Sequence, residues 1–433
     1  MTHPPGSLGL PFVGETPLFV LKEHKFYEER LKKHGPIFKS HIMGNPCIVV
    51  TGDKAVEFIL SKGMDNLSWG NGWPGTFKEL LGRSLFVQDG EEHRKKRRLL
   101  MNAFRPHSLI SYIPKIEDHV LYHLELWEKE GQFPWFPHLK TLTFDIASDI
   151  LLGQPSRETA RVLSDKFNTL TKGFFTIPTK IPGTPYHKAI KARDYLLKHI
   201  DEVIEERAEN PGKDAISYLI QGEDEEGNKL THEELSVQAL LLLFAGHDTT
   251  TSLTLSILRK LAEHPDVLLK ARQEQAELNI EGRLSKEQLN SMPYLDCIIK
   301  ETERMCPAVN GGFRGIEKTF EWGGYTFPKG WKLLYNIPET NNDPSNFPEP
   351  LLFKPERHLN PPEGLSKFSI VTFGGGPRLC LGMAFAKLEI KIILSYLLRN
   401  YEWEPIPNQD LRVTSVPIRL TKSGYIVDFK KRN

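Results

Sequence analysis

Cys380 has the most chemically suggestive surroundings in this chain. It lies in the ten-residue segment FGGGPRLCLG (373–382), just ahead of a strongly periodic apolar stretch. Glycine and proline before the cysteine predict a bend that leads into a helix. Backbone N–H groups of such a bend and the positive end of a helix dipole both lower the pKa of a thiol, and the thiolate is the form that binds metal. The segment predicts a metal-binding thiolate, with a structural cysteine behind a Gly-rich turn as the alternative.

A second set of polar residues lies in the middle of an apolar helix pattern. The run ALLLLFAG (239–246) is followed directly by HDTT (247–250). Asp248 and the Thr249 hydroxyl can relay protons at such a buried centre. Gly246 would let the helix loosen and the backbone approach a small ligand. The alternative is that the threonine hydroxyls simply bond to carbonyls one turn earlier.

Both segments resemble motifs of the cytochrome P-450 family, the haem-thiolate monooxygenases. AGHDTT (245–250) is similar to the family's oxygen-activation motif. The pattern of its haem-binding loop, Phe-x-x-Gly-x-Arg-x-Cys-x-Gly, is met by Phe373, Gly376, Arg378, Cys380 and Gly382. The resemblance implies haem b with the Cys380 thiolate as axial iron ligand. It implies that Asp248 and Thr249 are catalytic and deliver protons to bound oxygen, that Gly246 lies close to the haem, and that Ala245 lines the substrate pocket.

The resemblance also assigns roles to charged residues elsewhere in the chain. Glu301 and Arg304 are three residues apart on one helix face, a spacing that usually gives only a solvated ion pair. In the family this pair is buried and joined by a downstream arginine, here Arg357, so we expect the three to hold the cysteine loop. Haem propionates require cationic or donor partners. The candidates are Arg378, Arg314, His93 and Arg97, although many members have Trp where this chain has His93.

The elements that position these residues are mainly helical. We expect a mainly α fold with minor β, as one unit over residues 1–433, with a long central helix over the haem and small sheets near both ends. Thr231 and Glu234 form a capping-box pattern that begins this helix, and Pro265 ends it at about Glu263.

Shorter elements are predicted around it. Most of 55–305 has helical patterning, with one helix at 294–305 and another from about 381. Turn residues between alternating segments predict two hairpins, 37–42 with 47–51 and 318–322 with 325–327, and a strand at 331–335.

Composition narrows the class of protein. The 433 residues carry a net charge of +1, which argues against nucleic acid as the main partner. Four cysteines with no CxxC pair favour a reducing compartment. No signal peptide is visible, and the longest apolar run is far shorter than the roughly 20 residues of a membrane span. We expect a soluble, cytoplasmic monomer, although a chain trimmed of a membrane anchor would look the same.

The chain contains no GxGxxG dinucleotide fingerprint, so electrons must come from a separate protein. We expect a ferredoxin or flavodoxin-type donor with its reductase. The basic run HRKKRR (93–98) is a candidate docking surface for such an acidic donor, or else a solvated helix face.

Aromatic residues suggest a pocket for a large apolar substrate. The candidates are Trp69, Trp73, Phe77, Phe174 and Phe175, with Leu80, Leu81 and Ile177 beside them, and each can equally be a core residue. LGLPFVGE, GPIFK, LLLLFAGHDTT, MPYLD, NGGFRG and FPKGW are similar to the cyanobacterial and vertebrate retinoic-acid hydroxylases. This resemblance implies hydroxylation of retinoic acid or a related isoprenoid acid.

Two other functions are considered. One is a peroxide-using haem-thiolate enzyme acting on fatty acids or hydroperoxides. The other is a non-catalytic haem protein that binds a gas or transfers electrons. Neither needs an acid–alcohol pair for proton delivery, so Asp248 and Thr249 argue against both.

Overall fold

The computed structural model describes residues 2–10, 13–154, 156–414 and 418–432. The helices are α1 (Thr16–Leu21), α2 (Glu23–His34), α3 (Asp53–Leu60), α4 (Gly75–Leu81), α5 (Gly90–Leu100), α6 (Pro106–Glu130), α7 (Trp135–Leu152), α8 (Arg157–Thr171), α9 (Pro185–Glu209), α10 (Ala215–Gln221), α11 (His232–Glu263), α12 (Pro265–Glu277), α13 (Lys286–Asn290), α14 (Pro293–Met305), α15 (Ile337–Asn341) and α16 (Met383–Asn400). The strands are β1 (Ile37–Ile42), β2 (Asn45–Val50), β3 (Leu67–Ser68), β4 (Gln132–Pro134), β5 (Gly311–Ile316), β6 (Phe320–Trp322), β7 (Tyr325–Phe327), β8 (Lys332–Asn336), β9 (Tyr401–Pro405), β10 (Val413–Thr414), β11 (Leu420–Thr421) and β12 (Ile426–Lys431).

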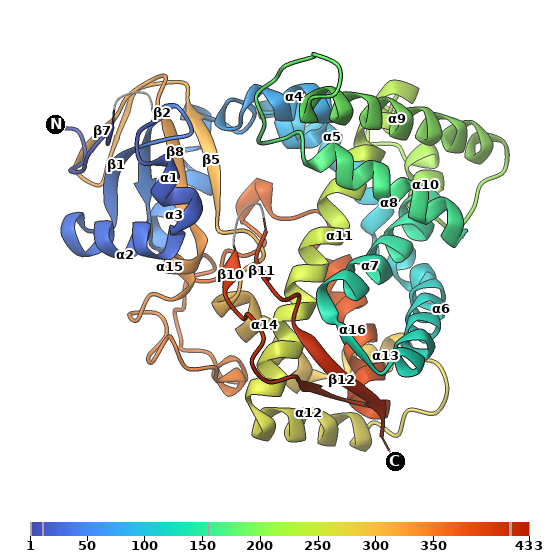
Figure 1. Cartoon of the computed structure of the whole chain (residues 1–433). Coiled ribbons are helices and arrows are strands. Elements are labelled where there is room, and N and C mark those ends of the chain that lie inside the picture. Colours follow the sequence, from blue (N-terminus) through green and yellow to red (C-terminus); the bar gives the residue numbers. More distant parts are fainter. Residues whose placement is uncertain (1, 11–12, 155, 415–417, 433) are drawn as a thin grey trace.

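The molecule has a sheet side and a helical side (Figure 1). The sheet side is a five-stranded sheet in the order β1-β2-β8-β5-β3, in which only the β2–β8 pair is parallel. Its own apolar cluster lies between the sheet and α3 and is distinct from the larger cluster among the helices. The mainly α fold with small sheets towards both ends of the sequence confirms the predicted fold class.

The predicted hairpins form, with strand limits that differ by one or two residues. β1 and β2 pair antiparallel, with Ile42 opposite Asn45, and β6 pairs antiparallel with β7. Gly44 has a φ of +74° at the first turn, a conformation that glycine adopts without steric cost. The strand predicted to begin at Trp331 begins at Lys332.

The long helix α11 crosses the helical side, where it lies against α7, α9, α14 and α16 (Figure 1). Its capping box is present: the Glu234 backbone N–H donates to Thr231 Oγ1 at 3.3 Å, and the Thr231 N–H donates to Glu234 Oε2 at 3.0 Å. The helix continues without a break from His232 to Glu263. These bounds agree with the predicted helix, which continues through the polar residues 246–250.

Two further elements complete the frame of the site. α14 ends next to the 3-10 turn Pro355–His358, and α16 begins directly after the Cys380 loop. The three-stranded sheet β4-β12-β9 brings the C-terminal strand against the strand that follows α16. Of the helices in the part of the chain that the structure describes, none is long and apolar enough to cross a membrane.

Candidate active site

The Cys380 loop is a tight turn that depends on its glycines. Gly374 and Gly376 have φ values of +73° and +56°, and a Cβ on Gly376 would clash with the carbonyl oxygen of Leu60. The Cys380 N–H donates to the Phe373 carbonyl at 2.8 Å and closes the loop. These constraints fix where the sulfur lies, just before the first turn of α16.

Cys380 differs from the other three cysteines because its side chain is exposed, whereas they are buried. The many protein atoms around its sulfur nevertheless desolvate the thiol and raise its pKa. This outweighs the backbone N–H groups of Gly382 and Met383 and the charge of Arg97, which lower it. The backbone N–H groups of the bend therefore lower the pKa of the thiol, as predicted, but desolvation has the larger effect on it. Bound metal supplies the additional positive charge that keeps such a sulfur deprotonated.

The structure brings the four predicted propionate partners into one region. The charges of Arg97 and Arg378 both act on the His93 imidazole, and the charge of Arg314 acts on Arg378. The four residues come from α5, β5 and the Cys380 loop, which are far apart in the sequence.

Arg314 and Arg378 are held in different ways. Arg378 pairs with Asp89 at 2.8 Å. Arg314 is 3% exposed, lies 3.3 Å over the Trp69 ring, and has a terminal nitrogen with no hydrogen-bond partner in the described ranges. A buried guanidinium nitrogen without an acceptor is costly, and a carboxylate satisfies it. The donor set therefore fits haem, with Cys380 for the iron and Arg314 for a propionate.

His93 is buried on the inner side of α5. Burial, together with the charges of Arg378 and Arg97, lowers its pKa to about 3. A neutral imidazole can still donate one hydrogen bond to a propionate, but it adds no positive charge. The positive charge in this region therefore comes from the arginines.

The predicted catalytic pair lies on α11. Thr249 Oγ1 donates to the Ala245 carbonyl at 2.7 Å. This is the hydrogen bond to a carbonyl one turn earlier that was the alternative to a role in proton transfer. Asp248 is ion-paired with Lys140 of α7 at 2.8 Å, a partner that sequence spacing could not identify. A Cβ on Gly246 would meet only Leu151, at 3.9 Å, so protein packing does not require glycine there.

Glu301 is the centre of a buried ionic network. Arg304 donates to both its carboxylate oxygens, at 2.8 and 2.9 Å, and Arg357 Nε donates to Oε1 at 3.0 Å. Glu301 and Arg304 are both 0% exposed, so this is no surface pair. His358, which the sequence analysis did not single out, lies 2.8 Å from Oε2. The feature of the sequence that could have identified His358 is its position directly after Arg357.

Asn341 connects this network to the cysteine loop. Its side-chain amide donates to the Arg304 carbonyl at 3.2 Å and accepts from the Val371 N–H at 2.9 Å. Thr372, directly before Phe373, donates to the Glu303 carbonyl at 2.5 Å. The end of α14 is thereby bonded to the residues that lead into the Cys380 loop. Sequence reasoning missed Asn341 and Thr372, because neither belongs to a motif.

Most of the predicted aromatic residues form one cluster. The Phe77 ring centroid lies 5.1 Å from that of Trp73, 4.5 Å from that of Phe174 and 5.3 Å from that of Phe175. Two aromatic residues outside the predicted set, Phe86 and Phe244, join it.

The remaining members of the predicted set differ in their surroundings. Trp69 lies against Arg314 and Arg378 and also meets Phe86 edge-on, with ring centroids 6.2 Å apart, so it lies at the border of this cluster. Leu80 and Leu81 are core residues. Ile177 is 81% exposed at the surface. Ala245 is exposed on α11 beside Phe244, although most of the helix around it is buried.

Comparisons with known proteins agree with this arrangement. The family model described as cytochrome P450 matches residues 4–429. Putative cytochrome P450 120 of Synechocystis is 38% identical over 96% of this chain and 94% of its own length, and cytochrome P450 26A1 of Gallus gallus is 36% identical over 93% and 85%. The solved structure described as retinoic acid bound cyanobacterial CYP120A1 matches with a TM-score of 0.92 and 36% identity over 100% of both chains. The Cys380 loop, the fold and these similarities show that this chain belongs to the cytochrome P450 family, whose members bind haem b through a cysteine thiolate.

Proposed function

We propose that this monooxygenase hydroxylates a retinoid, or a related long apolar isoprenoid acid, at a C–H bond held above the haem. Membership of the family makes the chain an oxidoreductase that acts on a small substrate with electrons from a redox partner. The observation that carries the retinoid proposal is the match, over the full length of both chains, to a structure described as retinoic acid bound.

The aromatic cluster and α11 support an apolar substrate. Phe77 and Phe174 are 3% and 2% exposed, so they form a packed base, while Phe175 and Ala245 present exposed apolar surface. A long conjugated chain gains free energy from contact with such surfaces. We assign Trp73, Phe86 and Phe244 to the same apolar surroundings.

We assign the following roles to the chain's own residues. Bound haem supplies the activation of O₂ for insertion of one oxygen atom into a C–H bond. Cys380 holds the iron, and Arg314, Arg97, His93 and Arg378 orient the cofactor. Asp248 and Thr249 would hold and pass on the protons that the reaction consumes, with Lys140 positioning the Asp248 carboxylate. An electron donor of the ferredoxin or flavodoxin type, with its reductase, completes the system.

Substrate binding can be tested directly on the haem-loaded enzyme. All-trans retinoic acid should shift the ferric Soret band from low to high spin at micromolar concentration, and palmitate should do so more weakly. Turnover with NAD(P)H, ferredoxin and reductase should give a hydroxylated retinoid by mass spectrometry.

Ala245→Leu should weaken the retinoic-acid shift about tenfold by filling the space beside the substrate. The matched control is Ala208→Leu, at an exposed position on α9.

The outcomes separate the alternatives. A normal reduced carbon-monoxide spectrum without any retinoid shift would reject the retinoid and leave the family assignment intact. Equal turnover with hydrogen peroxide alone would favour the peroxide-using alternative. Absence of product with every tested apolar acid and both electron sources would favour a non-catalytic haem protein.

A further inference from the structure

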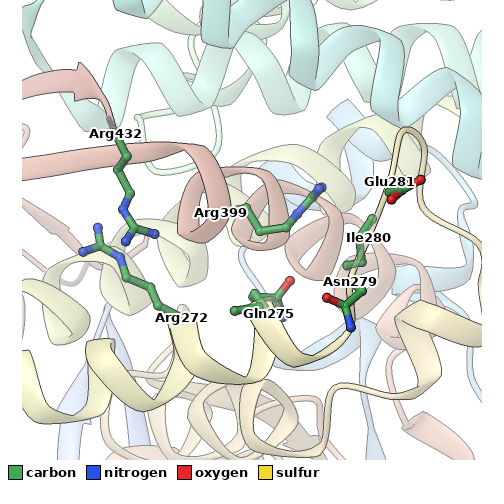
Figure 2. Close-up of a pocket in the computed structure, with 8 residues that line it drawn as sticks. Arg272, Gln275, Asn279, Ile280, Glu281, Arg399 and Arg432 are labelled. Atoms are coloured by element: carbon green, nitrogen blue, oxygen red, sulfur yellow. The ribbon is translucent and has the colours of Figure 1, made fainter.

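A polar pocket of about 300 Å³ lies away from the haem region, between α12, the end of α16 and the residue after β12. Arg272 and Gln275 come from α12, Arg399 from the last turn of α16, and Arg432 from the C-terminal segment (Figure 2). α16 has 18 residues, so its end is about 27 Å from its start beside Cys380. The pocket is therefore separate from the active site.

The pocket gathers positive charge. In Figure 2 the side chains of Arg272 and Arg432 point toward each other, while Asn279 and Glu281 lie at the opposite end. Burial lowers the pKa of Arg272 and the nearby charge of Arg432 lowers it further, while the charge of Glu402 offsets only part of this. Glu402 lies 4.0 Å from Arg432 but does not line the pocket. The end formed by Arg272 and Arg432 therefore has like charges facing each other, which an anion would relieve.

The guanidinium groups are fixed in place by backbone carbonyls. Arg272 donates to Tyr401 at 3.0 Å, Arg399 to Ser395 at 3.2 Å and Arg432 to Leu398 at 3.1 Å. Buried nitrogens of two of them, Nε of Arg272 and a terminal nitrogen of Arg399, have no hydrogen-bond partner among the described residues. These donors are thus oriented in advance and still unsatisfied.

Gln275 adds a third unsatisfied donor and is 1% exposed. Ser395 Oγ donates to its Oε1 at 2.6 Å, which sets the orientation of the amide. Its Nε2 is buried and has no hydrogen-bond partner in the described part of the chain. A buried amide donor without an acceptor destabilises the fold unless a ligand supplies one.

We propose that this pocket is a binding site for a small oxyanion, the phosphate or carboxylate group of a metabolite. Such a group offers only acceptors, which satisfies the donors of Arg272, Gln275 and Arg399 and neutralises the pair formed by Arg272 and Arg432. The volume is at the lower end of small-molecule sites. Glu281 and Asn279, at the far end, favour a ligand that carries a hydroxyl or amino group away from its anionic end.

The first test measures the melting temperature of the haem-loaded enzyme against inorganic phosphate, with ionic strength held constant by sodium chloride. A ligand that binds only the folded state raises Tm, by about 3 °C for a chain of this length at 100 times its Kd. Citrate in place of phosphate shows whether carboxylates are preferred. A saturable rise with either anion is expected, and no rise beyond that of chloride would overturn the proposal.

Two variants locate the effect. Arg432→Gln should weaken the phosphate response, so that at least tenfold more phosphate is needed for the same rise in Tm. Lys431→Gln removes the same charge from the neighbouring exposed residue and should leave the response unchanged.

Gln275→Glu keeps the acceptor for Ser395 and places a carboxylate among the arginines. It should raise Tm without phosphate and abolish the phosphate response. A lower Tm with the response retained would place the anion elsewhere.

Discussion

Around Cys380 the chain gathers more positive charge than its own carboxylates neutralise. Among the residues that the structure describes, Arg378 has a carboxylate within 4 Å, while Arg97 and Arg314 have none. Arg314 is the most deeply buried of the three arginines. Such an arrangement is costly without a bound anion and favourable with one. The residues are therefore arranged for the cofactor, at some expense to the stability of the protein without it.

The substitution Arg314→Leu tests this balance, because it should lower the affinity for haem and raise the stability of the haem-free protein. The variant should bind haem about tenfold or more weakly, because a propionate loses a charged donor. Its haem-free form should be more stable by about 1–3 kcal/mol, because an unsatisfied buried group is removed. Haem titration and urea unfolding of the apoprotein measure the two effects. Destabilised apoprotein would show that Arg314 is satisfied by the protein alone.

Thr249→Ala removes a hydroxyl from the partly exposed side of α11, one turn after Ala245. We expect normal haem content, but hydroxylated product per NAD(P)H about tenfold lower, with hydrogen peroxide released instead, because proton delivery fails. The matched control is Thr250→Ala, whose hydroxyl donates to the Gly246 carbonyl at 2.8 Å in the protein interior. Equal coupling of electrons to product in both variants would remove Thr249 from the relay.

At the scale of elements, α14 and the 3-10 turn Pro355–His358 are joined through one carboxylate. Burial alone would raise the pKa of Glu301, but hydrogen bonds from Arg304 and His358 lower it to about 2. Burial also lowers the pKa of His358. In the folded protein the network therefore consists of an ionised glutamate and a neutral histidine. Protonation of Glu301 weakens the link to the Cys380 loop, and protonation of His358 places a charge in a buried position.

The stability of this link should depend on pH in a defined direction. An unfolded glutamate has a pKa near 4.3, above the folded value, so the unfolded chain binds the proton first. The stabilisation, on the order of 3 kcal/mol, is complete above about pH 5 and is lost as the pH falls towards 2. His358 acts in the same direction below about pH 6.5. Urea unfolding between pH 7 and pH 3 measures this loss.

Glu301→Gln provides the control for that measurement, because an amide does not titrate. The variant should be less stable at pH 7, and its stability should change less with pH between 5 and 3 than that of the native protein. An unchanged slope would assign the acid sensitivity to other carboxylates.

At the scale of the whole molecule, α5 has an inner and an outer side. His93 is buried and Arg97 lies in the haem region, while Lys96 pairs with Glu234 of α11. The exposed basic residues of the run are Arg94, Lys95 and Arg98. The basic run is therefore not one surface, and these three residues are what a docking partner can contact.

The double substitution Lys95→Glu and Arg98→Glu should raise KM for an acidic ferredoxin about tenfold at low ionic strength, with less effect at high salt. The carbon-monoxide spectrum and the retinoid-induced Soret shift should not change, since neither residue faces the interior. Lys431→Glu, at an exposed position of β12, is the charge control. Similar KM values for all variants would place the donor on another face.

Features that depend on local spacing could be predicted from the amino-acid sequence. The Cys380 loop, the capped helix α11, the hairpins and the pairing of Glu301 with Arg304 all involve residues a few positions apart. Their geometry follows from turn chemistry, helical periodicity and capping. The same locality allowed the family resemblance to be stated from short motifs.

Contacts between distant segments could not be predicted from the sequence and became visible in the tertiary structure. It paired Asp248 with Lys140, added His358 and Asn341 to the Glu301 network, and placed the Trp69 ring over Arg314. It also showed that burial outweighs the loop's N–H groups at Cys380. The physical reason is that desolvation and ion pairing depend on what packs around a group, and packing is set by the whole fold rather than by neighbouring residues.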